Sequence, residues 1–401
     1  MCALELEDKC DKIASLIGTV EEVAMIAANL KDAKRLVPVL LTLLLISPSM
    51  FSNQDTMLNQ SAYTTMSRRI VTALKPERGE KIILRFDPET LPALEPVLRK
   101  MLADAGASVE TMNYGPAPDL EKRLDQTDIY VWLPAGPGAT TPSDQAEILG
   151  RWLDAGRGRQ VHFHWGDGSR GTDGLTGTHS ATYDRVYLDA LDIDYSALDA
   201  QMERAIRILR SGEVRVTSPV GTDIRFRVGD RPFCKQNGDA SKDRMKTAKI
   251  RIDREIELPA GALRVAPIEE SVNGTMVIPW ARINNKELRN IRIEFNQGVV
   301  TRATSENDQE TLTRYMNSGP GLSRFRELAI GFNSKLVTPQ GERLVAYYGY
   351  GAGIVRMGLG DNSEIGGKVR GGPIRWLFFT DTTVKVGNEM LVEQGRLIVK
   401  Q

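Results

Sequence analysis

The chain has 401 residues, of which 52 are Lys or Arg and 52 are Asp or Glu, so its formal net charge is zero. This length exceeds one small core and predicts two or three domains. The balanced charge argues against a general nucleic-acid-binding protein, which normally carries a basic excess. The three cysteines, Cys2, Cys10 and Cys234, provide neither a disulfide framework nor the spacing of a zinc site.

Residues 1–54 are predicted to be an N-terminal extension that contains a signal peptide. The apolar run Leu36–Ile46 (LVPVLLTLLLI) follows Lys34 and Arg35 and precedes small polar residues, which is the order typical of a secretory signal. The run is too short to span a bilayer comfortably, and the alternative is a buried core helix. The signal interpretation places the mature protein in the periplasm or outside the cell, whereas the alternative leaves it in the cytoplasm.

Strands and helices alternate over residues 60–211. Lys81–Phe86 (KIILRF) is predicted to be a strand, Ile129–Leu133 (IYVWL) is predicted to be a buried strand, and Thr90–Ala105 has apolar residues at helical spacing. Strands that alternate with helices of this length predict a mostly parallel sheet with helices on both faces. We therefore expect a Rossmann-like α/β domain in this half of the chain.

Over residues 212–401 the pattern changes to short strands separated by turn residues. Glu213–Thr217 and Ile291–Phe295 are examples, and Glu310–Ser318 and Arg324–Leu328 are expected to be short helices. A succession of short strands with intervening turns predicts an antiparallel barrel or sandwich. The fold class expected for the whole chain is therefore α/β, with a parallel-sheet domain followed by a β-rich antiparallel domain.

The second half also contains an ordered set of five motif-like stretches. In chain order they are Val214–Phe226 (VRVTSPVGTDIRF), Leu258–Gly274 (LPAGALRVAPIEESVNG), Phe325–Asn333 (FRELAIGFN), Arg356–Gly367 (RMGLGDNSEIGG) and Pro373–Leu377 (PIRWL). As a set, they resemble the thermophilic aminopeptidase T type of metallopeptidases over roughly residues 212–401. The resemblance implies a homodimer that removes N-terminal residues from peptides, with two metal ions that polarise the carbonyl and activate water.

Most of the metal-ligand positions that the resemblance implies carry other residues. The glutamate expected directly after Pro-x-Gly is Ala262, and the first histidine is Arg356. The expected His-x-Asp pair is Arg375-Trp376-Leu377, and a tyrosine position falls on Ser363. Only the second glutamate is kept, as Glu327. One carboxylate cannot hold two divalent ions, which need several carboxylates and imidazoles.

Glu327 is open to three interpretations. It could ligate a metal as in the family, or it could form a surface ion pair worth under ~1 kcal/mol. We favour a third interpretation, in which Arg356 and Arg375 occupy the vacated positions, supply the missing positive charge and pair with Glu327. Arginine keeps its charge when buried and can grip a carboxylate through two hydrogen bonds, so such a pocket would suit a peptide C-terminus or a small organic acid.

The sequence thus predicts an aminopeptidase-type metallopeptidase homologue with an eroded metal site. Glu327 is the candidate catalytic residue, and Arg356, Arg375 and Tyr350 are the candidate substrate-binding residues. We expect no metal at the family position, and zinc or cobalt there only if other side chains have rebuilt it. The alternative function is a metal-free, exported binding or scaffold protein that uses an arginine-lined cleft for an anionic ligand. The expected partners are a peptide or small anion and a second copy of the chain, not nucleic acid.

The three histidines of the chain, His162, His164 and His179, lie in one short region. His162 and His164 are two residues apart on a predicted strand, so both point to the same face. Together with Asp167 they could hold a zinc or iron ion. The interpretation that we favour is a polar strand end, because spacing alone identifies no third ligand and no supporting hydrogen bonds.

Overall fold

The computed structural model describes residues 58–136, 142–166 and 180–399. Several predicted features fall outside these ranges: the segment Leu36–Ile46, Cys2, Cys10, Asp167 and His179. None of the helices in the described ranges is long and apolar enough to cross a membrane. The described residues pack as one compact unit, and the domain boundary expected near residue 212 stays a prediction.

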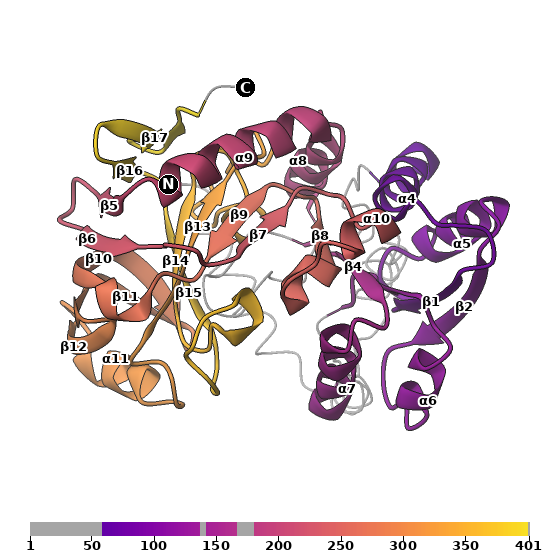
Figure 1. Ribbon diagram of the computed structural model, residues 1–401, viewed down its shortest axis with the longest axis horizontal. Coiled ribbons are helices and arrows are strands. Elements are labelled where there is room, and N and C mark those ends of the chain that lie inside the picture. The colour runs from indigo at the N-terminus through magenta and orange to yellow at the C-terminus, as the bar shows by residue number, and fades with distance from the viewer. Residues whose placement is uncertain (1–57, 137–141, 167–179, 400–401) are drawn as a thin grey trace, which may run out of the picture. The chain divides into compact units, whose positions relative to one another are not determined.

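The expected parallel sheet is present and has five strands in the order β2-β1-β3-β4-β8 (Figure 1). All neighbouring pairs are parallel. The strands are β1 (Lys81–Phe86), β2 (Ser108–Asn113), β3 (Ile129–Trp132), β4 (Arg159–Phe163) and β8 (Glu255–Leu258). The edge strand β8 comes from the second half of the chain, so this edge brings together residues about a hundred positions apart in sequence.

Helices cover both faces of the parallel sheet. Ile82 and Leu84 of β1 share a buried apolar cluster with three helices, α4 (Gln60–Leu74), α5 (Leu94–Asp104) and α8 (Ala181–Leu191). The intervening Ile83 packs on the opposite face with α6 (Leu120–Leu124) and α7 (Ser143–Asp154). Because successive strand residues point to opposite faces, the central residues Ile82–Leu84 are apolar on both sides of the sheet. The sequence predicted this cover of helices on both faces.

Two antiparallel sheets make up the β-rich half, again as predicted. The first has the order β12-β11-β10-β6-β5-β16-β17-β18, and the second has the order β15-β14-β13-β9-β7. The strands of the first sheet are β5 (Glu213–Thr217), β6 (Asp223–Arg227), β10 (Asn273–Ile283), β11 (Lys286–Asn296), β12 (Val299–Thr304), β16 (Thr383–Val386), β17 (Glu389–Glu393) and β18 (Arg396–Leu397). Those of the second are β7 (Phe233–Gln236), β9 (Ala262–Val265), β13 (Phe325–Gly331), β14 (Val355–Leu359) and β15 (Arg375–Phe379).

The two antiparallel sheets share one hydrophobic core. Leu328 of β13 and Met357 of β14 are buried in it with Phe226 of β6 and Met276 of β10. Helix α9 (Tyr195–Arg210) packs against the same core. The short helical segments are α10 (Lys242–Met245), α11 (Gln309–Met316), η3 (Arg251–Arg254), η4 (Glu269–Ser271), η5 (Tyr347–Gly349) and η6 (Ser363–Ile365).

One predicted element is wrong. The segment Arg324–Leu328 was expected to be a short helix, but Phe325–Leu328 belong to strand β13, which is buried along its whole length. The start of this strand was not recognised in the sequence because it contains two adjacent charged residues, Arg326 and Glu327, which are both buried. Both side chains are buried because a β-bulge in β13 turns them into the same ionic cluster.

Candidate functional site

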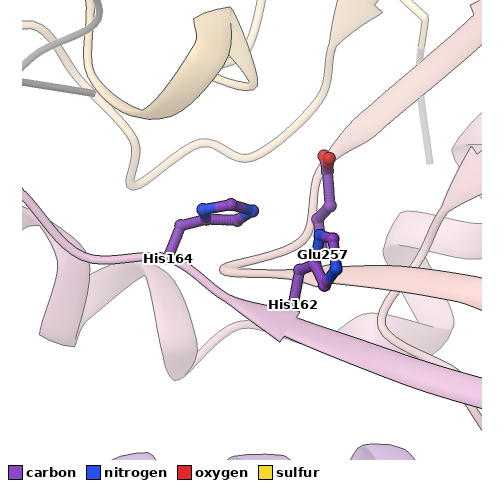
Figure 2. Close-up of side chains that lie close together, drawn as sticks. All are labelled: His162, His164 and Glu257. Atoms are coloured by element: carbon purple, nitrogen blue, oxygen red, sulfur yellow. The ribbon is translucent and has the colours of Figure 1, made fainter. Parts of the chain in front are cut away.

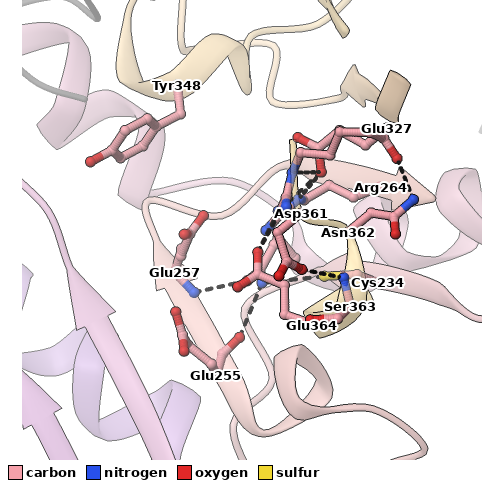
Figure 3. A network of polar contacts seen from close by, with 12 residues as sticks. Cys234, Glu255, Glu257, Arg264, Glu327, Tyr348, Asp361, Asn362, Ser363 and Glu364 are labelled. Carbon is pink, nitrogen blue, oxygen red and sulfur yellow. Dashed lines mark hydrogen bonds and ion pairs between the residues drawn. The ribbon is translucent and has the colours of Figure 1, made fainter. Parts of the chain in front are cut away.

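A buried ionic cluster is centred on Glu327, and we call it the arginine cluster: Arg264, Arg326, Arg356, Glu327 and Glu364 (Figure 3). Arg264 donates from Nε and Nη2 to Oε2 of Glu327, at 3.2 and 3.0 Å. Nη2 of Arg356 lies 3.0 Å from the other carboxylate oxygen, and Nε of Arg326 lies 3.5 Å from Oε2. Glu327 is therefore held by three guanidinium groups.

Strand register explains how two of these arginines reach the same carboxylate. Ala329 of β13 pairs with Arg264 of β9 on one side and with Arg356 of β14 on the other. Directly paired residues point to the same face of a sheet, so the two guanidinium groups flank the central strand. Arg264 was not predicted as a partner of Glu327, although its alternation with the buried Leu263 and Val265 placed it on the opposite face from the core.

A β-bulge brings the third arginine into the cluster. The pairing of β13 with β14 shifts register between Phe325 and Leu328, which are both buried in the hydrophobic core. A bulge inserts an extra residue and re-aims side chains. Here Arg326 and Glu327, which are adjacent in sequence, both enter the ionic cluster. Arg326 also forms an ion pair with Glu364 of η6, whose side chain is 28% exposed.

The cluster keeps Glu327 ionised. Burial alone would raise the pKa of this carboxyl, but the attraction of Arg264, Arg356 and Arg326 outweighs it and sets the pKa at about 2. Several guanidinium nitrogens stay without hydrogen-bond partners among the described residues, including Nη1 of Arg326 and Nε of Arg356. The cluster therefore has an ionised centre and spare N–H donors.

Aromatic residues surround Arg356. Its guanidinium carbon lies 4.6 Å from the centre of the Trp376 ring and 5.6 Å from that of Tyr350, and Nη1 donates to the carbonyl of Tyr348 at 3.2 Å. Cations are attracted to the faces of aromatic rings. These contacts fix the position of Arg356 beside Glu327.

The structure does not bring Arg375 to this cluster. Its guanidinium lies over the ring of Tyr315, at 5.1 Å, and Nη2 donates to Oγ of Ser318 at 3.4 Å. The expectation that Arg375 lines the same pocket as Arg356 and Glu327 is therefore wrong. The reason is alternation along β15, where Leu377, two residues on, is buried in the hydrophobic core.

A second group lies at the carboxyl ends of β4 and β8, and we call it the histidine group: His162, His164 and Glu257 (Figure 2). His162 and Glu257 are direct register partners across the two parallel strands. The ligand atoms of the three side chains all lie within 4.8 Å of one another. Sequence analysis identified the two histidines but missed Glu257, because the pairing of β4 with β8 leaves no local signal in the sequence.

The histidine group is closely surrounded by polar and aromatic side chains. Nδ1 of His162 lies 3.2 Å from Oε1 of Glu255, and its Nε2 contacts the amide nitrogen of Gln160. The His164 ring lies 4.8 Å from the Trp132 ring, centre to centre. Burial lowers the pKa of His162 to about 4 and that of His164 well below its ordinary value. Both imidazoles are therefore neutral at pH 7, which is the form that binds metal ions.

Tyr350 connects the two groups. Its hydroxyl hydrogen-bonds to Glu257, and its ring faces Arg356. In Figure 3, Glu255 and Glu257 lie on the same side of the arginine cluster as Glu364. Tyr350, which was predicted to bind substrate, thus lies between the two groups and is itself buried.

The comparisons agree with the sequence resemblance. Residues 189–342 match the family model described as thermophilic metalloprotease (M29). The solved structure of 2,5-dihydroxypyridine dioxygenase from Pseudomonas putida KT2440 aligns with a TM-score of 0.59 at 16% identity, covering 86% of this chain and 99% of the other. Wild-type AmpT from Thermus thermophilus aligns with a TM-score of 0.55 at 15% identity, covering 85% and 99%. No curated protein matches the chain.

These matches confirm the predicted resemblance and fold: the chain has the metallopeptidase-like fold that AmpT shares. The M29 family is metal-dependent. In this chain, most of the positions that correspond to the family's metal ligands carry residues unsuited to that role. Ala262 and Leu377 carry no donor atom, Arg356 is a cation, and Glu327 is already held by three guanidinium groups. These residues do not fit a metal ion.

Proposed function

We propose that this chain is an aminopeptidase-T-type homologue that has exchanged two-metal peptide hydrolysis for the binding of a small carboxylate ligand at the arginine cluster. The observation that carries the proposal is the coordination of Glu327 by Arg264, Arg326 and Arg356 at 3.0–3.5 Å. A divalent ion cannot displace three buried cations from that carboxylate without a large electrostatic cost.

The spare donors of the cluster support anion binding. The three guanidinium groups exceed the two carboxylates of the cluster by one charge, and buried N–H groups of Arg326 and Arg356 lack partners among the described residues. An unsatisfied buried donor costs free energy that a ligand oxygen would recover. Arginine suits this role, because its planar fork can bind both oxygens of a carboxylate.

The test compares ligand binding in two arginine variants by isothermal titration calorimetry. Succinate and a dipeptide serve as probes, and the dipeptide amide serves as the comparison that lacks the carboxylate. Arg356→Met should weaken binding at least about tenfold, in line with the loss of a charge-assisted hydrogen bond, and Arg356→Lys should weaken it less. Arg375→Met is the matched control, because Arg375 lies outside the cluster, and it should bind as the unchanged protein does.

The competing function, metal-dependent aminopeptidase activity, predicts a different result. Amino-acid p-nitroanilides would then be hydrolysed after addition of zinc or cobalt, and Glu327→Gln would abolish the activity. We expect release no faster than in a buffer blank. We also propose that the mature protein is exported and that it forms a homodimer.

A further inference from the structure

We infer that His162, His164 and Glu257 form a mononuclear binding site for a divalent transition-metal ion, separate from the family position around Glu327. The inference is independent of carboxylate binding at the arginine cluster. Its basis is the donor set: two imidazoles and one carboxylate from two adjacent strands, with ligand atoms within 4.8 Å of one another (Figure 2). Two histidines and one carboxylate are a donor set used for zinc and for non-haem ferrous iron.

The geometry needs only small adjustments to hold an ion. Metal–ligand bonds of about 2.0–2.2 Å place the ligand atoms of one ion roughly 3–4 Å apart, so side-chain rotations that move the donors by less than about 1 Å suffice. The backbone framework is fixed by the parallel ladder, in which His162 pairs with Glu257 and Phe163 pairs with Leu258. Ligands in open α/β sheets bind at this carboxyl end of the strands.

The polar neighbours of His162 are of the kind found around a metal-binding histidine. Metal-binding histidines generally donate their second ring nitrogen to a carboxylate, which fixes the tautomer and raises ligand basicity. Glu255 stands in that position, with Oε1 3.2 Å from Nδ1. The other nitrogen, Nε2, faces the amide of Gln160, so an ion bound at Nε2 would take the place of that amide.

The local charge also favours a cation. Glu255 and Glu257 lie two residues apart on β8, and neither forms an ion pair with a Lys or Arg in the part of the chain that the structure describes. Glu255 instead contacts the ring of His162, and Glu257 accepts a hydrogen bond from the Tyr350 hydroxyl. Buried carboxylates are normally paired with a cation or coordinate one. A divalent ion would offset the negative charge of the ionised carboxylates, whereas the nearby arginines already pair with other carboxylates: Arg264 with Glu327 and Glu364, Arg356 with Glu327, and Arg251 with Asp154.

The site is partly exposed, since the side chain of His162 is 22% exposed. The rings of Trp132, Tyr347 and Tyr348 contact the ring of His164. With three protein ligands, an ion has at least one coordination position left for water or for an oxygen donor of a ligand. Glu257 is thus expected to be a metal ligand, and Glu255 a positioning residue that acts through His162.

The test measures the metal content and the metal affinity of protein that carries no polyhistidine tag. The chain is stripped with a chelator, titrated with Zn²⁺ or with Co²⁺ as a spectroscopic probe, and analysed by elemental analysis after desalting. We expect one ion per chain, a visible Co²⁺ absorption, and a thermal midpoint that rises with added Zn²⁺. Glu257→Gln and His164→Asn should lose the ion, while their thermal midpoints without metal show whether they fold.

Two further variants separate this site from its alternatives. Glu255→Gln should keep one ion per chain but bind it about 10–100-fold more weakly, because only the orientation of His162 is affected. Glu342→Gln is the control, because Glu342 is exposed and lies outside both groups of site residues, and it should leave the stoichiometry unchanged. An ion that is lost in Glu327→Gln and kept in Glu257→Gln would overturn the inference, as would the absence of binding at micromolar Zn²⁺ and Co²⁺.

Discussion

Nη2 of Arg356 lies 3.0 Å from Oε1 of Glu327, and both side chains are buried. The ion pair between these two residues was predicted from the sequence and is confirmed by the contact. A buried carboxylate that neutralises several guanidinium groups stabilises the fold mainly because its removal would leave those charges uncompensated.

The first prediction is that Glu327→Gln lowers the free energy of unfolding by about 3–5 kcal/mol, the range for breaking a buried ion pair from one side. The glutamine keeps the shape of the side chain but not its charge. Urea unfolding followed by circular dichroism measures the change. Glu342→Gln is the control, because Glu342 is exposed, and it should change the stability by less than about 0.5 kcal/mol. Equal effects of the two substitutions would contradict the assigned role of Glu327.

The second prediction concerns pH. Arg159 donates from Nη1 and Nη2 to the two oxygens of Glu80, at 2.7 and 2.8 Å, and this pair joins β4 to the residue before β1. Burial tends to raise the pKa of Glu80, but the hydrogen bonds and charge of Arg159 outweigh it, so the pKa lies below its ordinary value. A carboxyl with a lowered folded-state pKa stabilises the fold above its unfolded-state pKa, and this contribution is lost as the pH falls through the folded-state pKa.

Stability should therefore decrease on acidification below about pH 4.5, the ordinary range of a glutamate pKa, and Glu80→Gln should reduce that decrease. Denaturant midpoints at several pH values between 3 and 7 measure it in both proteins. A curve for Glu80→Gln that runs parallel to that of the unchanged protein would show that this pair contributes nothing to the acid sensitivity.

The third prediction tests the N-terminal segment, which lies outside the described residues. If Leu36–Ile46 is a signal peptide, the full-length chain expressed in a Gram-negative host should be cleaved between about residues 47 and 54 and recovered from the periplasm. Intact-mass analysis of the purified protein identifies the N-terminus. A soluble cytoplasmic product that retains residues 1–50 would show that the segment has another role.

The fourth prediction concerns assembly. The resemblance to aminopeptidase T implied a homodimer. Size-exclusion chromatography with light scattering should therefore give a mass twice that of one mature chain. The mass should not change over a tenfold dilution in the micromolar range, as expected for a stable dimer. A monomer at all concentrations would rule out this part of the family resemblance.

The sequence by itself determined the fold class, because hydrophobic periodicity is a local property. Alternating apolar strands and helices predicted the parallel sheet, and the short strands beyond residue 212 predicted the antiparallel sheets. The ordered motifs carried the resemblance to the aminopeptidase T type, and the ligand positions implied by that resemblance predicted the contact of Arg356 with Glu327. Each of these inferences used spacing along the chain or a comparison of motifs.

Tertiary structure decided the composition of both groups of site residues. The β-bulge in β13 turned Arg326 toward Glu327, strand pairing added Arg264, and the alternation of β15 carried Arg375 to Tyr315. Glu257 reached His162 only because β8 joins the parallel sheet beside β4. These contacts depend on strand register between segments far apart in the chain, and a one-residue change of register would send each side chain to the opposite face. The sequence records which residues can carry charge or bind metal, but only the pairing of strands decides which of them meet.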